Sequence, residues 1–409
     1  MPKTINGAKL GTFAITRPRF NSSFLTYQKI EQLAKRCGFR MLEDTVHKPR
    51  EYEIIVGNCQ REGVKKFDDR DAFEVRIEGK KVFINGGSHP ATTIAIYEFQ
   101  RILREKEEFT DADSLTGSYA ETVKNYDDAT FYKPVFFDDF DDIEGDHVSP
   151  NGIDTTKWNL RGGDGHSSWS AEGHNGARCD RSLDPNRVYV KDSCFQVHPY
   201  YDAEKNVHYG GFLESNGKMK FTYGYVEISA KIPHGDGFWT ALWLRCNDRS
   251  GRVRPEIDVN ECFGNGCGVN ANLHTWPGEE AEQYGITHTQ LNRQDYFERL
   301  HWCPDDKSFH DDFHTFGVLW THDVAWFTCD GVPYFKYTMG DKETDFECFG
   351  KRVWIVISEA VGFHHVKDPL NNTPEQWEND SAYYVDWCYL YQIKDGQQII
   401  EFAEKEQNK

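Results

Sequence analysis

The feature that most constrains the fold is a long series of short apolar runs that begins at about residue 131. Runs such as FTYGYVEISAKI, FWTALWLRC, VAWFTCDGVPYFKY and YYVDWCYLYQI follow one another, separated by glycine, proline and Asn/Asp clusters. Many short strands with few helices are typical of an antiparallel β-sandwich. An aromatic content of 14% suits the core of such a sandwich. We therefore predict an all-β domain over residues 131–400.

Residues 1–110 differ, because strand-like and helix-like patterns alternate there. Apolar residues recur at helical spacing in FLTYQKIEQLAKRCG, which stops at Gly38, and again in TTIAIYEFQRILREK. YEIIVG is typical of a short buried strand, and AFEVRIEGKKVFINGG of a hairpin that turns near Gly79. These patterns predict a small α/β accessory domain. Residues 111–130 are acidic and lack sustained periodicity, which favours a linker that can carry a short helix.

Charge and cysteine content narrow the partners and the compartment. The formal charge of −19 disfavours nucleic acid and anionic membrane as partners, and no run approaches 18 consecutive apolar residues. The first residues, MPKTINGAKLGTF, lack an apolar segment and a cleavage signature. Eleven dispersed cysteines, an odd number without zinc-ligand spacing, fit a reducing compartment. We expect a cytoplasmic protein, or a secreted one if a leader preceded this numbering, and we predict no oligomeric state.

Three carboxylic acids, Glu256, Asp258 and Glu261, are concentrated in the strand-like stretch RPEIDVNECFG. In a regular strand Glu256 and Asp258 share a face, whereas Glu261 falls on the opposite face. One extra residue, in a β-bulge at Val259–Asn260, would bring all three acids to one face. Such a group suits glycoside hydrolysis, in which one carboxylate is the nucleophile and another the acid/base. The spacing alone leaves an exposed acidic strand or a calcium site open.

The surrounding sequence supports the catalytic interpretation. PVFFDDFD, IDTTKW, FTYGYVEISAKIPHGDGFWTALWL, PEIDVNE, FHTFGVLWT, VAWFTCDGVPY and YYVDWCYLYQ occur in this order, and the series resembles glycoside hydrolase family 16 over about residues 131–395. The resemblance implies a concanavalin-like β-jelly roll with a concave cleft and a retaining double-displacement mechanism. It assigns Glu256 as the nucleophile, Glu261 as the general acid/base and Asp258 as the residue that assists them.

Aromatic side chains are the first candidates for sugar binding, because sugars stack on aromatic faces. Trp239 and Trp243 match a tryptophan pair that lines the cleft of the family, and their even spacing allows both to face it. His274 matches a histidine that the family places beside the acid/base residue, and Trp276 follows it in NLHTW. The alternative for each of these residues is a structural role in the core.

Arginines are concentrated just before the acids, in LRCNDRSGRVRPE. Arg249 and Arg252 are the candidates for recognising a sulfate or carboxylate on the sugar, since guanidinium groups bind such anions bidentately. The alternative is a solvated loop in which the arginines pair with local acids.

The resulting prediction is a multidomain chain with a catalytic jelly roll and a smaller N-terminal α/β domain. Its predicted function is that of a retaining endo-β-glycanase acting on poly- or oligosaccharides, with laminarin-type β-1,3-glucan as the first substrate. Thr240, Pro255 and Ser229 depart from the usual laminarinase pattern. An algal-type, sulfated or anionic β-galactan (agar, porphyran or carrageenan) therefore stays open as substrate, and so does a non-catalytic carbohydrate-binding protein.

Two further expectations follow from resemblance. We expect no catalytic metal and no required cofactor, but FFDDFDDIEGD, with Asp386 near the end of the domain, occupies a region in which family members hold a structural calcium ion. Residues 1–110 resemble the small α/β domain that precedes the catalytic barrel in glycosidase families 20 and 67, and we assign that domain no chemistry.

Overall fold

The computed structural model describes residues 3–126, 133–162, 173–264, 268–296, 300, 308–364, 366–393 and 397–403. The chain divides into two compact units. The first comprises Met1–Pro134 with Asp330–Val332, and the second comprises Val135–Cys329 with Pro333–Lys409. None of the described helices is long and apolar enough to cross a membrane.

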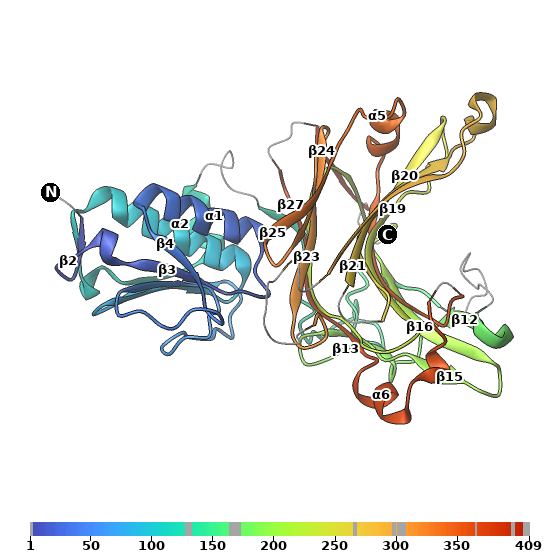
Figure 1. Cartoon of the computed structure of the whole chain (residues 1–409), viewed down its shortest axis with the longest axis horizontal. Coiled ribbons are helices and arrows are strands. Elements are labelled where there is room, and N and C mark those ends of the chain that lie inside the picture. The colour runs from blue at the N-terminus through green and yellow to red at the C-terminus, as the bar shows by residue number, and fades with distance from the viewer. Residues whose placement is uncertain are drawn as a thin grey trace. The chain divides into compact units, whose positions relative to one another are not determined.

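The first unit is a six-stranded sheet with two helices side by side on one face (Figure 1). The strand order is β4-β3-β5-β7-β6-β9. Strands β4, β3, β5 and β7 pair in parallel, and β6 pairs antiparallel with both β7 and β9. The bounds are β3 Ala14–Arg17, α1 Phe24–Cys37, β4 Arg40–Glu43, β5 Glu53–Val56, β6 Ala72–Glu78, β7 Lys81–Gly86, α2 His89–Glu105 and β9 Leu115–Ser118. A small sheet is formed by β1 Thr4–Ile5, β2 Ala8–Lys9 and β8 Glu108–Phe109.

Local chemistry explains the two predicted helices and the predicted hairpin, all of which are confirmed. Gly38 ends α1 in a left-handed conformation with φ 72°, which glycine adopts without a steric penalty. Ser88 begins α2, because its side chain accepts a hydrogen bond from the Ala91 backbone N–H. Strands β6 and β7 pair around a turn that contains Gly79.

The expected linker over residues 111–130 differs from what the structure shows. Strand β9 pairs with β6, and the short helix α3, Tyr119–Thr122, follows it, so the described part of this segment belongs to the first unit. Edge pairing through the backbone needs no apolar side-chain periodicity, which is why the sequence pattern did not reveal the strand. Residues 127–130 lie outside the described residues.

The second unit is a jelly roll of two stacked sheets, as predicted. Among the described strands, an eight-stranded sheet has the order β13-β14-β27-β18-β23-β24-β25, with β10 also on β27. A nine-stranded sheet has the order β11-β16-β26-β19-β20-β21-β22, with β12 and β15 also on β16. Figure 1 shows the two sheets facing each other.

The strands of the eight-stranded sheet are β10 Pro134–Asp138, β13 Val188–Val190, β14 Phe195–Val197, β18 Gly224–Lys231, β23 His314–Trp320, β24 Val324–Cys329, β25 Val332–Thr338 and β27 Tyr383–Tyr391. Those of the nine-stranded sheet are β11 Asn159–Leu160, β12 Arg178–Arg181, β15 Tyr200–Asp202, β16 Val207–Glu214, β19 Phe238–Arg245, β20 Val253–Cys262, β21 Gly268–Pro277, β22 Thr289–Tyr296 and β26 Trp354–Val361. Outside these sheets lie β17 Met219–Thr222, α5 Asp345–Phe349, α6 Pro374–Asn379 and β28 Ile399–Phe402.

Strand β19 shows how the nine-stranded sheet separates its two faces. Phe238, Thr240, Leu242 and Leu244 are fully buried on one face, between the sheets. The alternate residues Trp239, Ala241 and Trp243 border a cavity on the other face. The core between the sheets therefore anchors the strand, while its outer face is available for a functional site.

Candidate active site

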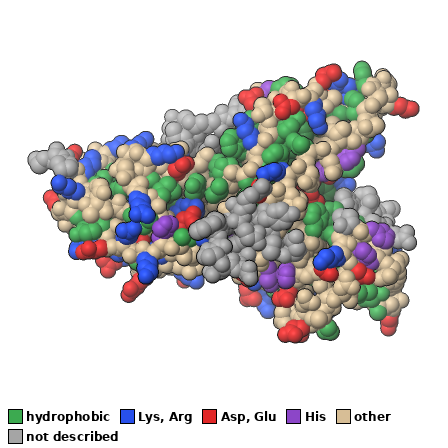
Figure 2. Space-filling model, viewed as in Figure 1, with side chains coloured by type: hydrophobic (Ala, Val, Ile, Leu, Met, Phe, Trp, Pro, Cys, Tyr) green, Lys and Arg blue, Asp and Glu red, His purple; other side chains and the backbone are tan. Residues whose placement is uncertain are grey.

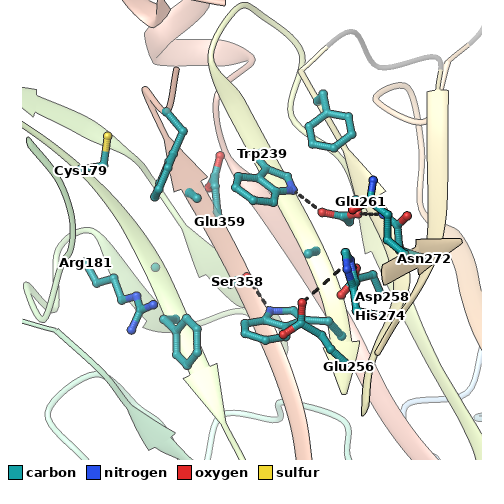
Figure 3. A pocket seen from close by; sticks show the side chains of 18 of the residues that line it. Cys179, Arg181, Trp239, Glu256, Asp258, Glu261, Asn272, His274, Ser358 and Glu359 are labelled. Carbon is teal, nitrogen blue, oxygen red and sulfur yellow. Dashed lines mark hydrogen bonds and ion pairs between the residues drawn. The ribbon is translucent and has the colours of Figure 1, made fainter. Parts of the chain in front are cut away.

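A cavity of about 470 Å³ lies on the outer face of the nine-stranded sheet. Its lining comes mainly from β12, β19, β20, β21 and β26, and Figure 3 shows the side chains that converge on it. All three predicted catalytic acids, Glu256, Asp258 and Glu261, border this cavity. On the face drawn in Figure 2, acidic and basic side chains are interspersed rather than separated into areas of one sign.

The predicted β-bulge is confirmed, and it explains how the acids share one face. On β21, Asn272 pairs with Asp258 while Asn270 pairs with Glu261, so one step of two residues opposes a step of three. The register between β20 and β19 shifts at the same place. One residue of β20 is therefore extra, and it restores Glu261 to the side of Glu256 and Asp258.

Glu261 is held by two neutral donors in a buried position. Trp239 Nε1–H donates to Oε1 of Glu261 at 3.0 Å, and the Asn272 side-chain amide donates to Oε2. Burial, with the negative charge of Asp258 as a second cause, raises the pKa of Glu261 to about 8, while the two donors oppose the rise. With 7% of its surface exposed, Glu261 is suited to carry a proton at neutral pH.

Glu256 and Asp258 are close to one histidine. His274 Nε2 lies 2.8 Å from Oδ2 of Asp258 and 4.0 Å from Oε1 of Glu256. Burial raises the pKa of Glu256, although His274 and Arg245 oppose the shift. Burial and then the charge of Glu256 raise the pKa of Asp258 well above its usual range. Ionising both carboxyls is therefore unfavourable, and a proton on Asp258 leaves Glu256 free to be the anion.

The structure brings His288, which the sequence did not indicate, against His274. His288 Nε2 lies 2.9 Å from His274 Nδ1, and the two rings are within 14° of coplanar. His288 precedes β22, whose pairing with β21 places the segment beside His274. No sequence motif identifies His288. Its position beside His274 results from the pairing of β21 with β22, and the length of the segment between these strands does not predict their register.

The predicted tryptophans all border the cavity, but in different ways. Trp239 hydrogen-bonds to Glu261, and Trp243 Nε1–H donates to Oγ of Ser358 at 3.1 Å. Trp276 stacks against His288, with ring centroids 3.8 Å apart and planes within 15°. One face of the Trp276 indole is therefore covered by an imidazole, which corrects the expectation of an open sugar platform for that face.

The two predicted arginines are not brought to the cavity, which corrects that part of the site. Arg252 pairs with Glu347 at 2.7 Å and with Glu343 at 2.9 Å, so its guanidinium is bound by local acids. Arg249 is not among the cavity-lining residues. Among the described residues that line the cavity, the one arginine or lysine is Arg181. Its guanidinium carbon Cζ lies 3.7 Å from the centroid of the Phe212 ring. Nothing in the sequence around Arg181 distinguishes it from other arginines.

Two groups of acidic side chains offer donor atoms that a metal ion could use. Glu256, Asp258 and His274 are the one group of three such side chains close enough to share an ion among the described residues, but Asp258 and His274 are already hydrogen-bonded to each other. In the region expected to hold calcium, Asp138 accepts hydrogen bonds from Phe140 N and Trp158 Nε1 and faces Lys157. Asp139 accepts one from Tyr389. Carboxylates bound by N–H and O–H donors do not fit a calcium site at these two positions.

The sequence of the second unit is similar to that of a known enzyme family. Residues 185–389 match the family model of glycosyl hydrolases family 16. The chain belongs to glycosyl hydrolase family 16. The match begins after the first unit, and the predicted resemblance of that unit to the accessory domain of families 20 and 67 is not supported by it.

Individual relatives are distant. Glucan endo-1,3-beta-glucosidase A1 of Niallia circulans is 27% identical over 273 residues, which cover 60% of this chain and 37% of that protein. Beta-1,3-glucan-binding protein of Penaeus monodon is 30% identical over 192 residues, covering 41% of this chain and 50% of that protein. The matches thus span half or less of these relatives. The crystal structure of the laminarinase catalytic domain from Thermotoga maritima MSB8 superposes with a TM-score of 0.49 at 22% identity, covering 64% of this chain and 99% of that one.

Proposed function

We propose that the protein is a retaining endo-β-glycanase that hydrolyses internal β-1,3-glucan bonds by double displacement. The observation that carries the proposal is the contrast between two glutamates on one strand. Burial raises the pKa of both acids, that of Glu261 to about 8, but at Glu256 the charges of Arg245 and Arg254 also favour the anion. Two carboxyls whose surroundings differ in this way suit acid catalysis and nucleophilic attack.

In the first step, an oxygen of Glu256 attacks the anomeric carbon and forms a glycosyl-enzyme ester. The bond to the leaving oxygen breaks, and Glu261 gives that oxygen its proton. In the second step, Glu261 takes a proton from water, the water oxygen bonds to the anomeric carbon, and the ester bond to Glu256 breaks. Asp258 holds a proton beside Glu256, which limits the repulsion between the two carboxyls.

The names of relatives support β-1,3-glucan as the substrate, since one is a glucan endo-1,3-beta-glucosidase and another a β-1,3-glucan-binding protein. Arg181 at the cavity favours a second candidate, an anionic β-galactan of the agar, porphyran or carrageenan type. A non-catalytic glycan-binding protein stays an alternative, but binding alone does not require three clustered carboxyls on one face.

The test is release of reducing sugar from laminarin, mixed-linkage glucan, agarose, porphyran and carrageenan by wild type and by the Glu256→Gln variant. We expect release from laminarin by wild type and a loss of at least about a thousandfold in the variant, because the nucleophile is removed. Equal release by both proteins rules out the enzyme proposal. Proton NMR of the first product tests retention, which requires the β-anomer to appear first.

Compartment and the first unit remain separate proposals. The nine cysteines among the described residues are all free, which supports a reducing compartment. We propose that the first unit is an accessory domain without chemistry of its own.

A further inference from the structure

Asp258, His274 and His288 form a continuous hydrogen-bonded series that runs from the buried acid to an exposed histidine. Asp258 is 5% exposed and His274 is 9% exposed, whereas His288 is exposed. The two links are 2.8 Å from Asp258 Oδ2 to His274 Nε2 and 2.9 Å from His274 Nδ1 to His288 Nε2. Both nitrogens of His274 are therefore engaged, and the orientation of its ring depends on both partners.

The rings are arranged so that hydrogen bonding and stacking reinforce each other. The His274 and His288 centroids are 5.1 Å apart and their planes differ by 14°, so the imidazoles meet edge to edge. The same His288 ring lies over the Trp276 indole at 3.8 Å. Trp276 thereby supports His288 in the plane of His274, which explains why the indole face is covered.

We propose that His288 is a positioning residue, which holds the His274 ring against Asp258 in the orientation needed by the catalytic acids. This inference rests on the proposed function for its catalytic consequence, although the ring geometry can be tested without activity. His288 also borders the cavity, so the test includes KM: a positioning role through His274 lowers kcat and leaves KM unchanged, whereas a direct contact with the glycan raises KM.

A histidine suits this position because it can donate or accept. When Asp258 is an anion, His274 Nε2–H donates to it, so His274 Nδ1 accepts from His288 Nε2–H. When Asp258 is protonated, its O–H donates to His274 Nε2, and His274 Nδ1–H donates to His288 Nε2. The ring of His274 thus keeps both hydrogen bonds, and its orientation, while Asp258 changes its protonation state.

The charged and titratable groups that face the two rings come from several strands. Strand β20 contributes Glu256, Asp258, Glu261 and Arg254, whose guanidinium lies over the Trp276 ring of β21. Arg245 comes from β19. Lys342 donates to Thr289, the residue after His288. The local field is therefore shared by the wild type and any His288 variant, and a change at His274 reports the loss of the His288 contact itself.

Three substitutions separate hydrogen bonding from stacking in the full-length protein. His288→Phe keeps a ring over Trp276 but removes the hydrogen bond, His288→Gln keeps a donor and an acceptor, and His288→Ala removes both. His322→Ala is the control, because His322 is a second histidine of the same unit outside the cavity lining. The primary readout is the nitrogen NMR spectrum of selectively labelled histidines, which reports which nitrogen of His274 carries the proton.

We expect the Phe and Ala variants to change the His274 tautomer and to lower kcat on laminarin about fivefold with an unchanged KM, consistent with the loss of one hydrogen bond. His288→Gln should restore most of both. Unchanged His274 nitrogens in the Phe variant, or restoration by Phe and not by Gln, overturns the proposal. An inactive wild type with a changed tautomer in the Phe variant overturns only the proposed function.

Discussion

Trp239 donates its indole Nε1–H to Oε1 of Glu261 at 3.0 Å. The indole comes from β19 and the carboxyl from the bulged part of β20, so the register shift between these strands creates the contact. A donor that faces a carboxyl stabilises its ionised form, and here it opposes the effect of burial. Trp239 therefore limits how far the pKa of the proposed acid rises.

The Trp239→Phe variant should raise the pKa of Glu261 above about 8, because it removes a hydrogen bond that favours the anion. General acid catalysis needs the protonated form, so the alkaline decline of kcat/KM should move to higher pH. The measurement is the pH profile of kcat/KM on laminarin. Trp243→Phe is the matched control, since its indole donates to Ser358 instead and its loss should leave the decline in place.

The Asp258→Asn variant should shift the same decline in the opposite direction. The charge of Asp258 is the second cause, after burial, of the raised pKa of Glu261. Asp258 carries that charge only at a pH high enough to remove its own proton. In that range the Asn variant lowers the pKa of Glu261, so the decline of kcat/KM should begin at lower pH than in wild type. A decline that moves to higher pH in this variant would contradict the electrostatic account of the site.

Ionisation of the buried Glu359 carboxyl should lower the free energy of unfolding of the second unit as pH rises. The residue is 1% exposed, neither of its carboxyl oxygens has a hydrogen-bond partner among the described residues, and burial raises its pKa well above the usual 4.5. Below about pH 4.5 the carboxyl is protonated in the folded and unfolded states alike, and no penalty arises. Above that pH the unfolded state releases the proton first, so the folded state loses stability until its own pKa is passed.

The Glu359→Gln variant should therefore melt at a higher temperature than wild type at pH 8, with a gain of about 1–3 kcal/mol, and at the same temperature at pH 4. Calorimetry at both values of pH is the measurement. Glu375→Gln, at an exposed position, is the control and should change neither. A gain of equal size at pH 4 would mean that the effect does not arise from ionisation.

Arg181 and Arg252 should differ in their effects on charged glycans. Arg252→Ala should leave activity on neutral and on anionic glycans within about twofold of wild type, because its guanidinium is bound by Glu343 and Glu347. Arg181→Ala should also preserve hydrolysis of laminarin. If wild type hydrolyses porphyran or carrageenan, the Arg181 variant should lose that activity selectively, and an equal loss on laminarin would contradict a role in anion recognition.

The sequence predicted those parts of the site that depend on spacing along one strand. Alternation of side chains required a bulge between Asp258 and Glu261, and the even spacing of Trp239 and Trp243 placed both on the cavity face. His288 and Arg181 depend instead on which strands pair and in what register, which local periodicity does not specify.

The remaining differences have the same origin. Arg252 is close to the acids in the sequence, but its acidic partners come from residues 343–347, about 90 positions later. The sequence pattern predicts a linker where the edge strand β9 lies, because backbone pairing, rather than an apolar pattern, places β9 in its sheet. Proximity in sequence was thus a good guide within strands and a poor one between them.

The extra residue in β20 also bears on how such sites diverge. If Val259 were deleted, the acids would follow one another as E-x-D-x-E, and simple alternation would still turn all three toward the same side without any irregularity in the ladder. Loss of a single codon therefore converts one spacing of the three acids into the other. All three carboxyls lie on the same face of the strand before and after the deletion.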